Sequence, residues 1–105
     1  MPVKNILIID DEVDVGTFFK RLLHKKGYRL TVAVNGEEAA TAIQETTFNV
    51  AMVDLKLPDT DGLTLLQQIK SLQPGCEVII MTGYSTTRTA FKAIQLGAFD
   101  YLEKP

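Results

Sequence analysis

Three aspartates, one threonine and one lysine each follow a short apolar run, and these side chains could together hold a metal ion and a phosphoryl group. They are Asp10, Asp11, Asp54, Thr82 and Lys104. Clustered carboxylates without histidine or several cysteines favour a hard, oxygen-seeking cation, and Mg²⁺ typically takes one or two carboxylates with water and phosphate oxygens. The three negative charges of the aspartates would be balanced by Mg²⁺ together with the lysine.

An aspartate carboxylate can also act as a covalent nucleophile toward a phosphoryl group. Phosphoryl transfer mainly needs positioning and positive charge around the phosphoryl oxygens, which Mg²⁺, Lys104 and the Thr82 hydroxyl could supply. Asp10 and Asp11 are adjacent and can share one cation, whereas Asp54 stands alone after the third apolar run. We therefore expect Asp54 to be the nucleophile.

The elements that must position these residues are predicted by the pattern of apolar side chains. Strands are expected at residues 5–9, 28–34, 49–54, 77–81 and 98–102. The stretches between the strands have apolar residues spaced as on one face of a helix. Because strand and helix alternate along the chain, we expect an α/β fold with a parallel, doubly wound sheet in the strand order 2-1-3-4-5.

The same spacing predicts the apolar face of each helix, and polar residues indicate where some of the helices begin. Asn35 with Glu38 three residues later resembles a capping box before the second helix, and Ser85 is the expected cap of the fourth. Glu12 and Asp14 are explained by the positive end of the first helix and receive no role in the site. The predicted apolar faces are Val15, Phe18, Phe19, Leu22 and Leu23; Ala39, Ala40 and Ile43; Leu65, Leu66, Ile69 and Leu72; and Ala90, Phe91 and Ile94.

Ligands of such a sheet bind at the carboxyl ends of its strands. The five polar residues named first all follow or end a predicted strand, so they are expected to converge on one edge of the sheet. Each of them alone has an ordinary explanation as a turn former, a helix cap or a solvated charge. Their coincidence at one edge favours a functional site.

Four stretches of the sequence resemble the receiver domain of bacterial two-component response regulators, in the order and spacing of that family. They are ILIIDDE, MVDLKLPDTDGL, IIMTGYS and GAFDYLEKP. The resemblance covers the whole chain and implies one flavodoxin-like receiver domain over residues 1–105. It implies a phosphoacceptor that takes a phosphoryl group from a sensor histidine kinase and controls an output domain or downstream effector, with transcription as the expected output. No separate substrate is implied, and a dimer that forms on phosphorylation is compatible with it.

Carried over residue by residue, the resemblance implies that Asp54 is the phosphoacceptor. Asp11 would bind Mg²⁺ directly, and Asp10 would act largely through water. The backbone carbonyl of Lys56 would be a further metal ligand, while its exposed side chain would tune the phosphoryl lifetime.

The same resemblance implies a contact between Lys104 and the phosphoryl oxygens, and a cis peptide bond from Lys104 to Pro105. Thr82 would be the switch hydroxyl that moves toward the phosphoryl group. Tyr101 would be the aromatic residue that swings inward behind it.

Receivers normally continue beyond the Lys-Pro pair into a fifth helix, whereas this sequence ends at Pro105. One face of the sheet would then be covered chiefly by the first helix, and apolar surface near the fifth strand would be exposed. We expect either a C-terminally truncated domain or a partner chain that covers this face.

Three other functions fit the sequence less well. An aspartyl-phosphate phosphohydrolase would need a second aspartate two residues after the nucleophile, where Lys56 stands. A dinucleotide- or flavin-binding module would need a glycine-rich turn where Asp10, Asp11 and Glu12 stand, and these carboxylates would repel a pyrophosphate. A degenerate receiver that works only as an unphosphorylated interaction module would lack some of the site residues, and none of the site residues is missing here.

The composition limits the remaining choices. The chain has 105 residues and a net charge of −2, with lysine and arginine scattered, so no direct nucleic-acid binding and no membrane contact are expected. No apolar run approaches the roughly 18 residues of a membrane span. The single cysteine, Cys76, excludes an internal disulfide and a multi-cysteine zinc site, and a cytoplasmic location is expected.

Overall fold

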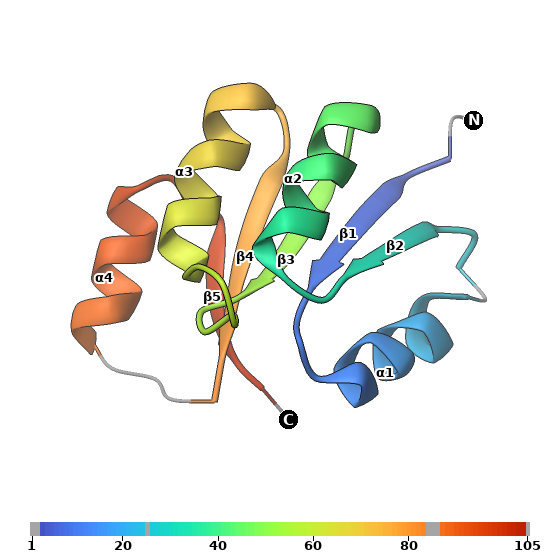
Figure 1. Cartoon of the computed structure of the whole chain (residues 1–105), viewed down its shortest axis with the longest axis horizontal. Helices are drawn as coiled ribbons and strands as arrows, with labels where there is room; N and C mark the ends of the chain where they lie inside the picture. The colour runs from blue at the N-terminus through green and yellow to red at the C-terminus, as the bar shows by residue number, and fades with distance from the viewer. Residues whose placement is uncertain (1–2, 25, 84–86, 105) are drawn as a thin grey trace.

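The computed structural model describes residues 3–24, 26–83 and 87–104, and it shows one five-stranded sheet flanked by helices (Figure 1). The strands are β1 (Asn5–Ile9), β2 (Arg29–Ala33), β3 (Val50–Asp54), β4 (Glu77–Thr82) and β5 (Asp100–Glu103). The helices are α1 (Val13–His24), α2 (Gly36–Glu45), α3 (Gly62–Leu72) and α4 (Thr87–Gln95). All strand pairs are parallel in the order β2-β1-β3-β4-β5, so the predicted fold class and strand order are confirmed. No helix in the described ranges is both long and apolar enough to cross a membrane.

The strand bounds differ from the prediction by one or two residues. Tyr28, Val34 and Asn49 lie outside the strands, and β4 extends to Thr82. The last strand covers residues 100–103 instead of 98–102, because Ala98 still belongs to the turn that closes α4 and its N–H donates to the carbonyl of Ala93.

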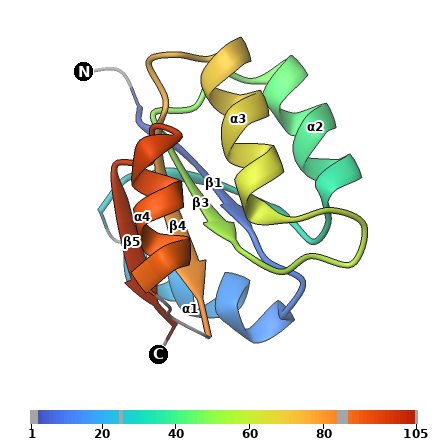
Figure 2. The ribbon, with the colours of Figure 1, turned by 90° about the vertical axis from the view of Figure 1, so that its left-hand side faces the viewer.

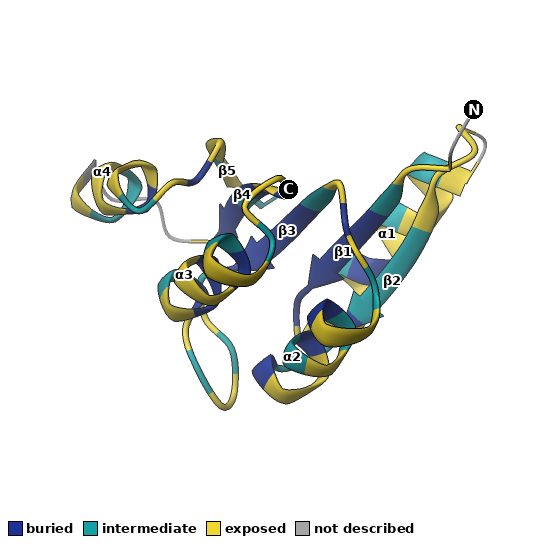
Figure 3. Cartoon of the chain, turned by 90° about the horizontal axis from the view of Figure 1, so that it is seen from above, coloured by how far each residue is buried: buried dark blue, intermediate teal, exposed yellow. Residues whose placement is uncertain are grey.

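Two apolar layers enclose the sheet, and the deepest residues lie in its central strands (Figure 3). One layer is formed by α2, α3 and α4 with alternate residues of β1, β3 and β4, such as Leu7, Val53 and Ile80. The other is formed by α1 with the residues between them, such as Ile8 and Met52. Figures 1 and 2 show α1 apart from the other three helices. Of the described helices, α1 alone covers this second face, as the sequence predicted.

The predicted apolar face of α1 is only partly buried. Val15, Phe19 and Leu23 pack on the sheet, but Phe18 and Leu22 are 47% and 51% exposed. The reason is the rotation of the helix: buried Gly16 turns toward β2, where a Cβ atom would lie 3.1 Å from Val32 Cγ1. Phe18 and Leu22 therefore lie on a side of α1 that the described residues leave largely exposed.

Two further apolar faces were predicted too broadly. Leu65, Leu66 and Ile69 of α3 are buried, but Leu72 in its last turn is 62% exposed. In α4 the buried residue is Ala93, so Phe91 and Ile94 project outward, with 65% and 50% of their surface exposed.

Helix α2 begins as the sequence predicted, with Asn35 as its cap. Asn35 Oδ1 accepts a hydrogen bond of 2.8 Å from the N–H of Glu38, and Glu38 Oε1 accepts one of 3.0 Å from the N–H of Val34. The return bond of the capping box is therefore displaced by one residue. Ser85, the predicted cap of α4, lies outside the described residues.

Candidate metal and phosphoryl site

The sheet itself brings the predicted site residues to one edge. Asp54 is the last residue of β3, and Thr82 is the last residue of β4. Asp10 follows β1 and is tied to the next strand by a 3.0 Å hydrogen bond from its N–H to the carbonyl of Ala33. Lys104 follows β5, and its N–H donates to the carbonyl of Thr82 at 2.9 Å. Backbone pairing thus extends to the residues that were predicted to form the site.

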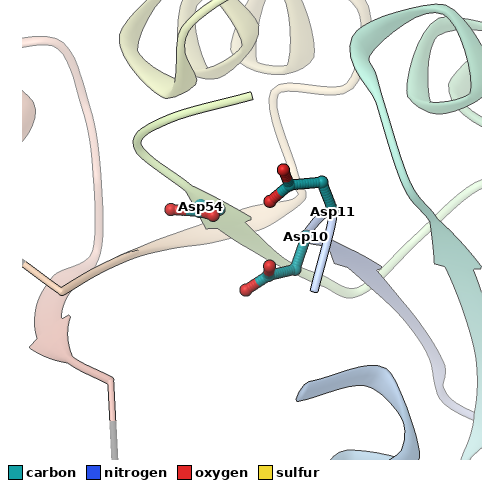
Figure 4. Close-up of side chains that lie close together, drawn as sticks. All are labelled: Asp10, Asp11 and Asp54. Atoms are coloured by element: carbon teal, nitrogen blue, oxygen red, sulfur yellow. The ribbon is translucent and has the colours of Figure 1, made fainter. Parts of the chain in front are cut away.

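The three aspartates form a cluster at this edge (Figure 4). One carboxylate oxygen from each of Asp10, Asp11 and Asp54 lies within 4.8 Å of the others. Asp10 and Asp54 are buried, whereas Asp11 is exposed. Asp10 Oδ1 accepts a 2.9 Å hydrogen bond from the N–H of Glu12, and Asp54 Oδ1 accepts one of 3.2 Å from the N–H of Lys56. These short local bonds fix the orientation of both buried carboxylates.

Lys104 bridges the two buried carboxylates. Its Nζ atom lies 2.8 Å from Asp10 Oδ2 and 2.9 Å from Asp54 Oδ2. Burial of the ammonium group works to lower the pKa of Lys104, but its close contacts with the carboxylates of Asp10 and Asp54 and the attraction of their charges outweigh this and raise the pKa. Lys104 therefore stays positively charged throughout the physiological pH range.

Burial is the main influence on Asp54, and it raises the pKa of this carboxyl group above its usual range. Hydrogen bonds from Lys104 and from the N–H of Lys56 oppose the rise, and the neighbouring charge of Asp10 adds to it. A divalent cation beside these carboxylates would favour the ionised form of Asp54. The ionised form of Asp54 and a bound cation would thus support one another.

The donor set fits a hard divalent cation. Three carboxylates face one lysine, so negative charge is in excess at the centre of the cluster. Asp10 Oδ2 is buried and, within the described residues, accepts no hydrogen bond of good geometry although Lys104 Nζ is close. A buried carboxylate oxygen in that state gains from an additional positive charge. The aspartate cluster could therefore hold a metal ion, and oxygen donors of this kind suit Mg²⁺.

A cavity of about 260 Å³ opens beside the cluster. It is smaller than the roughly 300–1,000 Å³ of sites for drug-sized ligands, and its polar lining suits an ion and a small anionic group. The lining residues are Asp11, Glu12, Asp54, Lys56, Thr82, Gly83 and Lys104.

Thr82 and Tyr101 lie on neighbouring strands and on the same face of the sheet. Tyr101 pairs with Ile80, two residues before Thr82 on β4. Thr82 is buried, while Tyr101 is half-buried and packs against the core formed with α2, α3 and α4. The cis peptide bond predicted between Lys104 and Pro105 lies outside the described residues, which end at Lys104.

Glu12 belongs to this neighbourhood, although the sequence reading assigned it only to the start of the first helix. Its Oε1 atom lies 3.4 Å from Lys104 Nζ, and its side chain is largely exposed. Ion pairs of this exposed kind contribute little to stability. The available signal was its position directly after Asp11 at the same strand end, which places three acidic residues in succession at the site.

Comparison with known proteins identifies the family of the chain. The family model of the response regulator receiver domain matches residues 6–105. The transcriptional regulatory protein ZraR of Escherichia coli (strain K12) is 38% identical over 101 residues, which cover 96% of this chain and 23% of that protein. The DNA-binding transcriptional regulator NtrC of Salmonella typhimurium is 40% identical over 100 residues, covering 95% of this chain and 21% of that protein. The chain spans less than a quarter of the length of these curated relatives.

Solved structures agree with this relationship. A response regulator protein from Burkholderia pseudomallei, solved with a phosphorylated aspartic acid, a calcium ion and citrate, matches 97% of this chain and 60% of its own, with a TM-score of 0.92 and 36% identity. The beryllofluoride-activated NtrC4 receiver domain dimer matches 98% of this chain and 85% of its own, with a TM-score of 0.92 and 37% identity. The chain therefore belongs to the response regulator receiver domain family.

Proposed function

We propose that this domain accepts a phosphoryl group on Asp54 from a sensor histidine kinase, in a reaction that depends on Mg²⁺. The observation that carries the proposal is the bridge from Lys104 to Asp10 and Asp54, at 2.8 and 2.9 Å, beside the cluster of three carboxylates. The bridge places a fixed positive charge against the proposed nucleophile. The transcriptional regulators among the relatives support an output domain that acts on transcription.

The metal would be held by Asp11, Asp54 and the backbone carbonyl of Lys56, with Asp10 acting largely through water. Bound Mg²⁺ would neutralise charge on the phosphoryl oxygens. Asp10 and Asp54 are positioned for this by their hydrogen bonds to the backbone two residues further on, which orient the carboxylates without using the oxygens that face Lys104.

In the transfer step, a carboxylate oxygen of Asp54 attacks the phosphorus of the phosphohistidine. The new O–P bond forms as the P–N bond breaks, and the histidine nitrogen keeps the electron pair. Lys104 then exchanges its contact with the Asp54 carboxylate for a contact with a phosphoryl oxygen. Positioning and electrostatic stabilisation supply the catalysis, and the domain has no separate substrate in this proposal.

The response to phosphorylation would begin at Thr82 and Tyr101. The Thr82 hydroxyl would move toward the phosphoryl group, and Tyr101 would turn inward behind it on the neighbouring strand. A surface of α4 and β5, on which Phe91 and Leu102 are exposed, would carry the change to an output domain or a second receiver. The dimer of the NtrC4 receiver domain supports such an assembly, and the cytoplasmic location expected from the sequence remains part of the proposal.

The proposal is tested by incubating the protein with acetyl phosphate and Mg²⁺ and measuring its intact mass. We expect one phosphoryl adduct that is lost in Asp54→Asn and does not form when the metal is chelated. Failure of the wild-type chain to form the adduct, or an adduct that persists in Asp54→Asn, would contradict the assignment. Sustained turnover of an external phosphate ester would instead favour a phosphohydrolase.

A further inference from the structure

The loop between β3 and α3 is attached to the start of α2 by one side chain. Asp59 Oδ1 accepts a 2.7 Å hydrogen bond from the N–H of Gly36, and Asp59 Oδ2 accepts one of 3.1 Å from the N–H of Glu37. The two segments are more than twenty residues apart in the sequence. Asp59 is thus a tertiary link between the loop that follows Asp54 and a different helix.

This link completes the cap of α2. The first N–H groups of a helix have no partner inside the helix and need external acceptors. Asn35 serves the N–H of Glu38, and Asp59 serves the two N–H groups before it. These hydrogen bonds hold the pKa of Asp59 below its usual range, and the bond from the N–H of Gly36 has the largest effect. The negative charge of Asp59 therefore stays at the positive end of the helix.

The approach of the loop to the helix is close enough to require a glycine. A Cβ atom on Gly36 would lie 2.5 Å from Thr60 Cγ2 and 3.2 Å from Asp59 Oδ1. A larger residue at position 36 would displace the Thr60 side chain and crowd the Asp59 carboxylate. The contact therefore depends on both partners: a small residue on the helix and a carboxylate on the loop.

The other end of the same loop lies at the phosphoacceptor. Lys56 and Asp61 form an isolated antiparallel bridge, and the N–H of Gly62 donates to the carbonyl of Leu55 at 2.8 Å. The N–H of Lys56 is in turn bonded to Asp54 Oδ1 at 3.2 Å. The loop is thus a closed structure with its base at Asp54 and its tip on α2.

We propose that Asp59 is a positioning residue for metal binding: by anchoring the tip of the loop to α2, it holds the backbone of Lys56 where its carbonyl can reach the metal. This inference rests on the proposed function of the site. Groups that orient metal ligands commonly affect metal affinity almost as much as the ligands do. The coupling is reciprocal, so a bound metal also strengthens the contact between Asp59 and α2.

The first test compares Asp59→Ala with Asn35→Ala by calorimetric titration with Mg²⁺. Both variants remove a cap of α2, but only Asp59 belongs to the loop. We expect Asp59→Ala to weaken Mg²⁺ binding about tenfold, as loss of an orienting group commonly does. Asp59→Asn, which keeps one acceptor oxygen, should have a smaller effect, and Asn35→Ala should stay close to wild type. Equal losses in Asp59→Ala and Asn35→Ala, or wild-type affinity in Asp59→Ala, would overturn the inference.

The second test needs no variant. Amide hydrogen exchange at Gly36 and Glu37 of the wild-type chain should slow when Mg²⁺ is added, because the metal favours the loop conformation in which Asp59 accepts their N–H groups. Unchanged exchange under saturating Mg²⁺ would overturn the inference while leaving the proposed function intact. Absence of Mg²⁺ binding and of phosphorylation in the wild type would instead count against the proposed function itself.

Discussion

Lys104 Nζ lies 2.9 Å from Asp54 Oδ2 although the two residues are 50 positions apart in the sequence. The contact exists because β5 and β3 both end at the same edge of the sheet, with β4 between them. Asp10 lies at the same edge and shares the ammonium group at 2.8 Å. One lysine thus compensates two buried carboxylates, and this relationship makes the stability of the domain depend on charge at the site.

The replacement Lys104→Met should destabilise the metal-free domain. It leaves Asp10 and Asp54 buried without a counter-charge, and loss of one partner of a buried ion pair commonly costs about 3 kcal/mol. Urea unfolding in a chelating buffer would measure the loss, with Lys20→Met on the exposed side of α1 as the matched control. Added Mg²⁺ should restore part of the stability of the Lys104 variant. Equal unfolding midpoints for the two variants would contradict this account.

The metal-free domain should become less stable as pH rises toward neutrality because of Asp54. Burial raises the pKa of this group in the folded chain above its ordinary value of 3.8, so the folded state binds the proton more tightly than the unfolded state does. Its contribution to stability is present below that value and is lost as pH rises through the folded pKa. In chelating buffer at pH 7, Asp54→Asn should therefore melt at a higher temperature than wild type.

Two internal controls accompany this pH prediction. The difference between wild type and Asp54→Asn should shrink at pH 3, where the carboxyl group is protonated in both states of the chain. Mg²⁺ at pH 7 should stabilise the wild type more than the variant, because a ligand stabilises the folded state in proportion to its affinity for it. A variant that melts lower than wild type at pH 7 in chelating buffer would refute the prediction.

The replacement Gly62→Ala should be severely disruptive, whereas Gly75→Ala should be tolerated. A Cβ atom at position 62 would lie 2.6 Å from the carbonyl oxygen of Asp54 and 2.8 Å from Leu55 Cα, both rigid backbone atoms. Overpacking of this kind typically costs about 1–3 kcal/mol. At Gly75 no atom lies within 4 Å of such a Cβ atom. Thermal melts of the two variants would decide, and similar melting temperatures would count against the close contact.

The thiol of Cys76 should be unreactive in the folded protein. It is almost fully buried, and burial raises its pKa to about 11, so the reactive thiolate is scarce at pH 8. Alkylation by iodoacetamide, followed by mass spectrometry, should be slow in buffer and fast once urea unfolds the chain. Rapid labelling without urea would show that the segment before β4, where Cys76 lies, opens readily.

The order of the elements and the place of the site follow from local patterns in the sequence. Short apolar runs that alternate with helix-period stretches predict a parallel sheet, and the carboxyl ends of its strands are where Asp10, Asp54, Thr82 and Lys104 are found. These features depend on neighbouring residues and on the general rules of α/β folds. The predicted fold is therefore confirmed, and the predicted residues do gather at one edge of the sheet, although Glu12 beside them was not expected there.

The sequence could not predict which half of an apolar face is buried. Phe18 and Leu22 fit the spacing of the α1 stripe as well as Phe19 and Leu23 do, yet they are exposed because α1 is rotated with Gly16 toward β2. A helical period specifies which residues share a face, and the neighbouring elements decide how far that face is covered.

By itself, the sequence determined the order of strands and helices and the set of acidic, hydroxyl and ammonium groups at one edge of the sheet. The tertiary structure decided how those groups are paired: Lys104 between two buried aspartates, Glu12 beside it, and Asp59 on the start of α2. The physical reason is that a hydrophobic pattern is formed by residues close together in the sequence and predicts only local secondary structure. Charge pairing and helix capping across the fold depend instead on distances that exist only after the sheet has assembled.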